Sequence, residues 1–518
     1  MKPIRKILFL AAVAVAVSSM VPAGAVYSQA ADEPGARGAA DTDREKALIH
    51  KERGDDFRVR NDIGGAAGEY GKALSLYRGF PREDRFMMAR YLSWAGRLDE
   101  AIRELREILS EDPGNAAART HLARCLAWNG KLRESLEESS AVLAASPDDK
   151  DALLARASAL KWSGNSNAAV SIYKGILSKG EDFDTRLGLS QAWLSDGFTR
   201  GARQGAALLK PEFPYQEKER GGLDNEIRKA TRPGVAAGYS RYDDSDDNRV
   251  DRYTLSGDFW TGNWKWGAGY LHVEAADPSR DVETDELSLS AQSMVTERIA
   301  VGGFAGLNRA SGGNPRTFAI GGANAEARLF DGRIGAGVAR RSFADTAVLI
   351  ANRIRFTEAA AHFEHPLPYR STFRAGVTRR GYSNENRSID LQGFLRHTFD
   401  MKNPQLAAGY RIRYLDFRKD SGGLYFDPNS YVSHRAEASI GWEAGRAYGY
   451  LVPFFGYQSY DRRGVTTNGT FGGAEGALGV NVTDSFAVEL HGEGSDEAGV
   501  TASGFRYRQF GARVRWRL

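Results

Sequence analysis

The last ten residues of the chain alternate strictly between apolar and other side chains. The apolar positions are Phe510, Ala512, Val514, Trp516 and Leu518, and the positions between them hold a glutamine, a glycine and three arginines. A period of two over this length predicts a β-strand with two unlike faces. Three unpaired arginines are too costly to bury against an ordinary core. We therefore expect the apolar face to meet lipid and the arginines to face a polar lumen, as in a transmembrane β-barrel.

The same alternation recurs throughout residues 233–518. Trp264, Trp266 and Tyr270 share one face of such a segment, and Lys265, Gly267 and Gly269 share the other. Short turns alternate with longer polar loops between the segments. Seven predicted turns lie near residues 262–263, 296–297, 331–332, 365–368, 401–404, 444–446 and 483–484. Eight predicted loops lie near 243–248, 275–281, 308–315, 343–347, 384–386, 418–429, 461–468 and 494–501. This predicts an antiparallel barrel of about sixteen strands, with fourteen or eighteen as alternatives.

A different pattern occupies residues 44–210. Trp94 recurs as Trp128 and Trp162, each followed two residues later by glycine and preceded at fixed distances by leucine and alanine. The spacing is the 34-residue period of tetratricopeptide repeats, in which each unit is a pair of antiparallel helices. The fold class is therefore an N-terminal α-solenoid followed by a C-terminal β-barrel. We expect the recurring glycine, for example Gly130, to lie where helices cross.

The tryptophans of these repeats have two interpretations. They pack between stacked helices, or they stay partly exposed as a partner surface on which sugar rings could stack. The candidate residues for either role are Trp94, Trp128 and Trp162.

The N-terminus has the features of a secretory signal. Lysines and an arginine precede the apolar run from Ile7 to Val17, and small residues suited to cleavage follow at 23–25 and at 28–30. The predicted organisation is a signal peptide (1–30), a polar leader (31–43), repeats (44–210), a linker (211–232) and a barrel (233–518). No later stretch is apolar and long enough for a membrane helix. A secreted chain with lipid-facing strands indicates the bacterial outer membrane, with short turns and repeats in the periplasm.

The sequence offers little for catalysis. The single cysteine, Cys125, excludes a disulfide framework and multi-cysteine metal sites. The histidines are scattered, and no phosphate-binding loop, nucleophile elbow or dinucleotide motif is present. We expect no enzyme activity, no cofactor, no metal and no nucleic acid, with the outer-membrane lipid, periplasmic proteins and a polysaccharide as partners.

Arginine dominates the charge of the second half and falls mostly on the face opposite the lipid. The candidate lumen-lining residues are Arg353, Arg355, Arg396, Arg411, Arg413, Arg513 and Arg515. One interpretation is a structural network in which arginines pair with Asp258, Asp390, Glu437 and Glu489. The other is a cationic conduit for an anionic or strongly hydrated polymer.

Signal peptide, repeats and C-terminal barrel together resemble the exopolysaccharide exporters of Gram-negative outer membranes, such as those for cellulose, poly-N-acetylglucosamine and Pel. The Leu-x-Trp-x-Gly helices around Trp94, Trp128 and Trp162 make the chain more similar to the YaiO-type barrel proteins. The resemblance implies passive passage of a polysaccharide, with the repeats engaging periplasmic partners.

Three classes of function remain open, and each predicts a different lumen. Polymer export predicts a continuous open lumen, and a general or anion-preferring porin predicts a long loop folded inward. A structural adaptor that uses the barrel as a membrane anchor predicts a plugged lumen. The largest predicted loop, 418–429, is not obviously long enough to constrict a pore.

Overall fold

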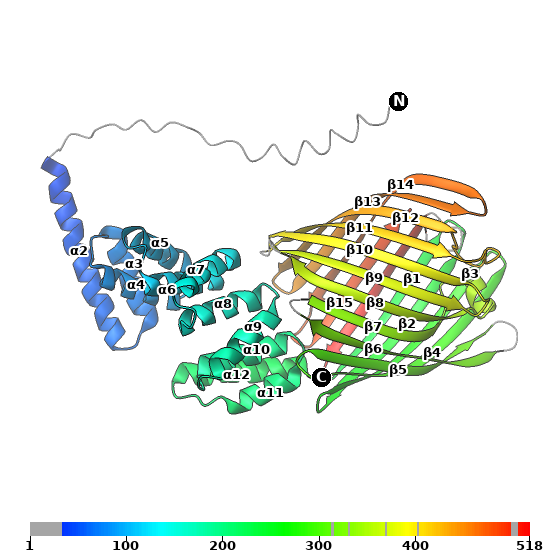
Figure 1. Cartoon of the computed structure of the whole chain (residues 1–518), viewed down its shortest axis with the longest axis horizontal. Coiled ribbons are helices and arrows are strands. Elements are labelled where there is room, and N and C mark those ends of the chain that lie inside the picture. Colours follow the sequence, from blue (N-terminus) through cyan, green and yellow to red (C-terminus); the bar gives the residue numbers. More distant parts are fainter. Residues whose placement is uncertain (1–33, 312–314, 330–331, 368–369, 401–402, 499–505) are drawn as a thin grey trace, which may run out of the picture. The chain divides into compact units, whose positions relative to one another are not determined.

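The computed structural model describes residues 34–311, 315–329, 332–367, 370–400, 403–498 and 506–518. The predicted signal peptide lies outside the described residues. The chain divides into two compact units, residues 1–108 and 109–518. The first contains helices and the second contains further helices followed by the barrel (Figure 1).

The helices of the first unit are paired by packing and by a buried ion pair. They are α2 (Pro34–Val59), α3 (Ile63–Leu76), α4 (Arg82–Trp94) and the start of α5 (Leu98–Glu111). Tyr70 of α3 and Met88 of α4 are fully buried. The guanidinium of Arg85 on α4 donates to Glu104 on α5, and both side chains are almost completely buried.

The second unit continues the helical repeats. Its helices are α6 (Ala116–Trp128), α7 (Leu132–Ala145), α8 (Lys150–Trp162), α9 (Ser166–Leu177), α10 (Phe183–Ser195), α11 (Thr199–Leu208) and α12 (Pro214–Ala230). Side chains of Asn115, Asp149, Asn165 and Asp182 accept backbone N–H groups at the starts of α6, α8, α9 and α10, which are the donors that a helix leaves unpaired. The segment 211–232, predicted as a linker with room for one short helix, contains the 17-residue helix α12.

The recurring glycine has a different role from the expected one. Gly130 adopts a φ of +75° between α6 and α7, and a Cβ placed on it would meet no atom within 4 Å. Gly96, Gly164 and Gly197 also have positive φ at the equivalent turns. The glycine is therefore required by the left-handed backbone that ends each first helix, and helix crossing does not explain it.

Replacing Gly130 with alanine should lower the free energy of unfolding of the repeats by about 1 kcal/mol, because an L-residue is strained in the left-handed region. Thermal melting followed by the helical circular dichroism signal measures the change. The control is Gly175→Ala, in helix α9, where a Cβ also meets nothing. There alanine should raise stability by roughly 0.5–1 kcal/mol. Equal effects at both sites would show that backbone conformation is not the reason for Gly130.

The strands form one closed antiparallel barrel in sequence order. They are β1 (Gly234–Asp244), β2 (Arg249–Thr261), β3 (Trp264–Asp277), β4 (Arg280–Met294), β5 (Ile299–Ala310), β6 (Arg316–Leu329), β7 (Gly332–Ser342), β8 (Arg355–Leu367), β9 (Ser371–Tyr382), β10 (Arg387–Asp400), β11 (Gln405–Phe417), β12 (Ser430–Ala444), β13 (Ala447–Arg462), β14 (Val465–Asn481), β15 (Phe486–Ser495) and β16 (Tyr507–Arg517). The ring closes where Gly234 of β1 pairs with Arg517 of β16. The predicted fold class and the count of sixteen strands are confirmed.

Connections from even-numbered to odd-numbered strands, where the turns were predicted, lie at one end of the barrel, the turn end. Connections from odd-numbered to even-numbered strands lie at the other, the loop end. Residues 331, 368, 401–402, 312–314 and 499–501 of the predicted turns and loops lie outside the described residues. The outer wall is apolar and exposed at positions such as Leu255, Trp266, Leu289 and Leu490. Three loops differ from their predictions. The loops predicted at 275–281 and 461–468 are two-residue connections, because β3 ends at Asp277 and β4 begins at Arg280, and β13 ends at Arg462 and β14 begins at Val465. The β7–β8 connection was expected to be brief, at 343–347, but it runs from 343 to 354 and contains the short helix α13 (Ala347–Ala351).

Candidate functional site

Cross-strand register assigns each side chain to the lumen or to the lipid. Arg513 pairs with Glu489 across β15 and β16, and Arg411 pairs with Arg435 across β11 and β12. Because paired residues share a face, following the register around the ring places one set of alternate residues on the inside of every strand. This set includes Arg396, Arg411, Arg413, Arg513 and Arg515.

The two remaining candidate arginines, Arg353 and Arg355, lie at the start of β8. Arg353 follows helix α13 and has a φ of +54°. Arg355 begins β8, and its guanidinium lies 5.0 Å above the ring of Phe318, which is on the lumen face of β6. Both therefore belong to the loop end of the barrel.

Many lumen arginines are neutralised by carboxylates on the same strand or on strands one or two positions away around the ring. Arg413 contacts Asp390 at 2.7 Å, Arg517 contacts Asp258 at 3.0 Å, and Arg513 contacts Glu489 at 2.5 Å. Arg435 contacts Glu437 at 3.1 Å. Each of the four carboxylates that the sequence suggested as partners thus meets an arginine, and a structural network accounts for this part of the lumen.

The lumen remains wet toward the turn end. The side chains of Arg333, Arg374, Arg513 and Arg517 are between 46% and 55% exposed although they point inward. Glu489 contacts two arginines, because Arg515 lies 3.6 Å from it in addition to Arg513. Such a surface requires water in this part of the barrel.

Apolar side chains fill the lumen at the loop end. Tyr382, Leu415, Phe417, Tyr431 and Tyr460 lie on the lumen face of β9, β11, β12 and β13, and all are buried. They pack against Tyr425 and Phe426 of the β11–β12 loop, residues 418–429. This loop is therefore folded inward.

Helix α13 connects this cluster to the opposite wall. Leu349 belongs to the cluster around Tyr431, whereas Ala347 and Ile350 pack with Val250 and Val273, on the lumen face of β2 and β3. Strands β1–β5 and β9–β13 lie on opposite sides of the sixteen-strand ring. The helix therefore lies inside the mouth of the barrel, between the β2–β3 wall and the inward-folded 418–429 loop.

A third segment packs in the same cluster. Ala498, in the β15–β16 connection, packs in the same cluster, and its N–H donates to Gln458. The adjacent Glu497 accepts hydrogen bonds from Tyr431 at 3.0 Å and from Ser433 at 3.3 Å. We call segments 343–354, 418–429 and 496–498 together the plug.

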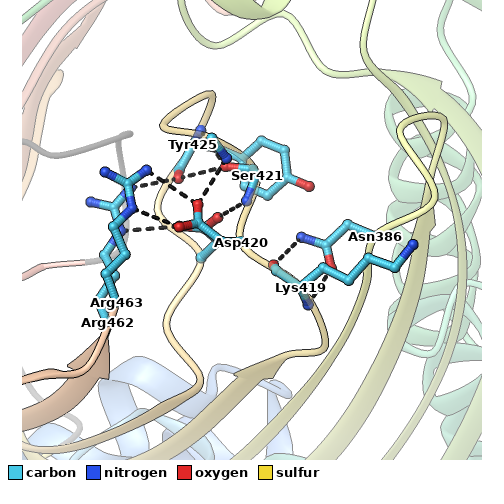
Figure 2. A network of polar contacts seen from close by, with 9 residues as sticks. Asn386, Lys419, Asp420, Ser421, Tyr425, Arg462 and Arg463 are labelled. Atoms are coloured by element: carbon cyan, nitrogen blue, oxygen red, sulfur yellow. Dashed lines mark hydrogen bonds and ion pairs between the residues drawn. The ribbon is translucent and has the colours of Figure 1, made fainter.

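A polar network fastens the 418–429 loop to β13 (Figure 2). The side chain of Asp427 is fully buried, meets the guanidinium of Arg462 at 3.0 Å, and accepts the N–H of Ser421. Arg462 also donates to the carbonyl of Tyr425 at 3.1 Å. The buried ion pair therefore holds both ends of the inward bend.

A second pair closes the outer side of the same loop. Asp420 meets Arg463 at 2.8 Å, but both side chains are 49% exposed. The hydrogen bond from Arg463 lowers the pKa of Asp420. Burial raises the pKa of Tyr425 in the same loop to about 12, so its hydroxyl stays neutral.

The plug was not predicted. The predicted loop ended at residue 347, whereas the apolar segment Ala347–Ala351 forms helix α13. The available signal was the run of aromatic residues on the polar phase near the loop end, at Tyr382, Phe417, Tyr431 and Tyr460, together with Tyr425 and Phe426 inside a loop.

The repeat tryptophans are partly exposed, at 43% for Trp94, 38% for Trp128 and 41% for Trp162. A cation covers each ring. Arg90 lies 4.8 Å from the ring of Trp94, Arg124 lies 5.4 Å from Trp128, and Lys161 lies 5.2 Å from Trp162. The structure therefore places these rings at the surface of the repeats.

Lys161 is the most perturbed of these cations. Burial lowers its pKa to about 8, and Nζ donates to Gln191 at 2.8 Å. The unfolded chain binds more protons than the folded one between about pH 8 and the ordinary value of 10.5, so folding is favoured as pH rises through this range.

Replacing Lys161 with methionine should remove this dependence. For the wild type, the free energy of unfolding of the repeats should rise between pH 7.5 and 10, whereas Lys161→Met should show a smaller rise. Chemical denaturation at the two pH values measures it. Lys179→Met, at a side chain that is 62% exposed, should keep the wild-type profile. A wild-type profile in Lys161→Met would mean that other groups cause the rise.

The last repeats contact the turn end of the barrel within the second unit. Arg328 of β6 meets Asp196 at 2.6 Å, and Trp193 donates to Glu297 of the β4–β5 turn at 3.1 Å. Burial raises the pKa of Asp196 despite the nearby arginine.

No helix among the described residues is long and apolar enough to cross a membrane. The same residues contain no group of three or more histidine, cysteine, aspartate or glutamate side chains that could hold a metal ion.

Comparisons with known proteins support the repeats and say little about the barrel. A tetratricopeptide repeat family model matches residues 95–158. A search of curated proteins finds no match. A tetratricopeptide repeat protein from Parabacteroides merdae is 18% identical, with 35% of this chain and 74% of that chain covered and a TM-score of 0.27. A thermophilic repeat protein from Thermus thermophilus is 16% identical, with 35% and 98% covered and a TM-score of 0.30.

One further solved structure is similar to this chain at a lower sequence identity. CdiB from Acinetobacter baumannii is 9% identical, with 55% of this chain and 60% of that chain covered and a TM-score of 0.38. Scores this low carry no functional argument. The sixteen-strand barrel and the repeats nevertheless suggest an outer-membrane protein with a repeat scaffold.

Proposed function

We propose that the chain is an outer-membrane conduit for the passive export of a polysaccharide, closed at the loop end by the plug when idle. The turn end and the repeats then face the periplasm, as short turns do in bacterial barrels. The repeats engage periplasmic proteins that deliver the polymer, and the chain itself catalyses no reaction.

The observation that carries this proposal is the contrast between the two halves of the lumen. Toward the turn end the wall is hydrated and lined by exposed arginines such as Arg374 and Arg513. Toward the loop end, among the described residues, inward-folded connections between strands pack against aromatic side chains of the wall. A barrel that served solely as an anchor would need no hydrated interior, and a closure made of loops can be displaced without unfolding the wall.

The test is conductance through a barrel that lacks the two longer plug segments, which we call the plug-deleted variant. In one variant, residues 344–353 and 419–428 are each replaced by a short glycine-serine linker, and the full chain is inserted in planar bilayers. We expect steady conductance from this plug-deleted variant and little from the wild type. Neutral polyethylene glycols of graded size then measure the width of the lumen, because a polymer that enters the pore lowers its conductance. The proposal requires a lumen wide enough for a single polysaccharide chain.

The second candidate function, a membrane anchor for the repeats, is favoured by the closure itself. It predicts that the plug-deleted barrel stays silent although it is folded, as judged by heat-modifiable migration on gels. That outcome would overturn the conduit.

A further inference from the structure

Arg341 and Arg411 are lumen arginines that lie over aromatic rings and meet carboxylates only at long distances. The guanidinium of Arg341 lies 4.5 Å above the ring of Phe304, and that of Arg411 lies 5.0 Å above the ring of Phe394. Their shortest carboxylate contacts, to Glu358 and Glu437, are 3.8 Å and 3.7 Å. These separations are too long for hydrogen bonds. Both arginines are accessible in the lumen, with side chains 49% and 39% exposed.

Glycines on the wall make room for these rings. Gly322 pairs directly with Phe304, and a Cβ at Gly322 would come within 2.8 Å of that ring. A Cβ at Gly409 would come within 2.6 Å of the ring of Phe394. The rings therefore lie against the backbone of the wall. Each guanidinium lies over a ring and is restricted in orientation.

The other carboxylates near Arg411 have their own partners. Arg435 lies between Glu437 and Glu497, at 3.1 Å and 3.9 Å, and is only 13% exposed. Glu493 accepts a hydrogen bond from Tyr507. The Nε of Arg411 is buried without a hydrogen-bond partner.

We propose that Arg341 and Arg411 are binding points for the carboxylate groups of an acidic polysaccharide in the lumen. This inference rests on the proposed conduit and names its substrate class. A planar guanidinium fork matches a carboxylate in shape and charge, and restricting the fork beforehand reduces the entropy lost on binding. Two points on separate strands, β7 and β11, suit a polymer with repeated charges more than a single small anion.

Binding to the full chain in detergent tests the proposal. Isothermal titration with oligogalacturonate of defined length should give a measurable affinity, whereas a maltooligosaccharide of equal length should not bind. Arg341→Gln with Arg411→Gln should weaken oligogalacturonate binding on the order of tenfold, as expected for losing charge-assisted hydrogen bonds. Arg374→Gln with Arg513→Gln is the matched control. It makes the same change in charge at arginines already bonded to Glu364 and Glu489 at 2.5 Å, and it should weaken binding much less.

If both double variants weaken oligogalacturonate binding equally, net charge explains the loss of affinity. Arg341 and Arg411 are then not the binding points. Equal binding of the neutral oligosaccharide, or no binding of oligogalacturonate, would overturn the substrate class. Conductance separates these failures from that of the conduit. If the plug-deleted barrel conducts and oligogalacturonate does not bind, this inference fails and the conduit stands.

Discussion

Asp427→Ala should release the β11–β12 loop from the lumen wall. The carboxylate is fully buried, pairs with Arg462 and accepts the N–H of Ser421. Its loss leaves Arg462, which is only 15% exposed, with its buried charge uncompensated. Removing one partner of a buried ion pair costs about 3–5 kcal/mol. This is a large fraction of the free energy that can hold a short loop in its inward position. We expect faster amide hydrogen exchange across residues 418–429 and intermittent conductance in planar bilayers.

The adjacent pair in Figure 2 supplies the control. Asp420 and Arg463 form the same kind of contact with side chains that are half exposed, and an exposed pair contributes about 0–1 kcal/mol. Asp420→Ala should therefore leave exchange in the loop and conductance close to wild type. If the two variants behave alike, or if exchange in Asp427→Ala stays slow, the buried pair does not hold the plug.

Much of the fold could be predicted because alternation reports which face of a strand meets lipid. Trp264, Trp266 and Tyr270 could share a face only on a strand, and the breaks between such runs separate one strand from the next. The repeats could be predicted for a similar reason, since a fixed period reflects one unit stacking on the next. The role of Gly130 could not, because a helix crossing and a left-handed turn both favour glycine.

The plug could not be predicted because its residues are compatible with two structures. The run from Ala347 to Ala351 is apolar throughout, and periodicity alone does not separate a short buried helix from the start of a strand. The pairing of Asp427 with Arg462 joins a residue of the β11–β12 loop to the last residue of β13, so no local spacing reveals it. The aromatic residues on the lumen phase, such as Tyr382 and Tyr431, were the observable departure from a polar interior.

Replacing Arg513 and Arg515 with glutamine should shift the ion selectivity of the open barrel toward cations. Both arginines point into the lumen and share one carboxylate, Glu489, at 2.5 Å and 3.6 Å. The wild-type group therefore carries an excess positive charge, and the double variant leaves Glu489 facing the lumen without a cation nearby. Charges on a narrow hydrated wall set the local concentration of ions. Measured under a salt gradient in the plug-deleted variant, the reversal potential should move from moderate anion preference toward cation preference.

The matched control changes the same net charge on the other face of the wall. Arg340 and Arg379 are next to the lumen residues Arg341 and Arg380 in sequence, so they point outward. Arg340→Gln with Arg379→Gln should leave the reversal potential nearly unchanged, because charges outside the barrel act on permeating ions only through a screened field. An equal shift in both double variants would assign selectivity to the total charge of the protein. The Arg513 and Arg515 variant could also keep an unchanged reversal potential with intact conductance. These arginines would then be structural partners of Glu489. The ion selectivity would have to come from residues nearer the plug, such as Arg341 and Arg411.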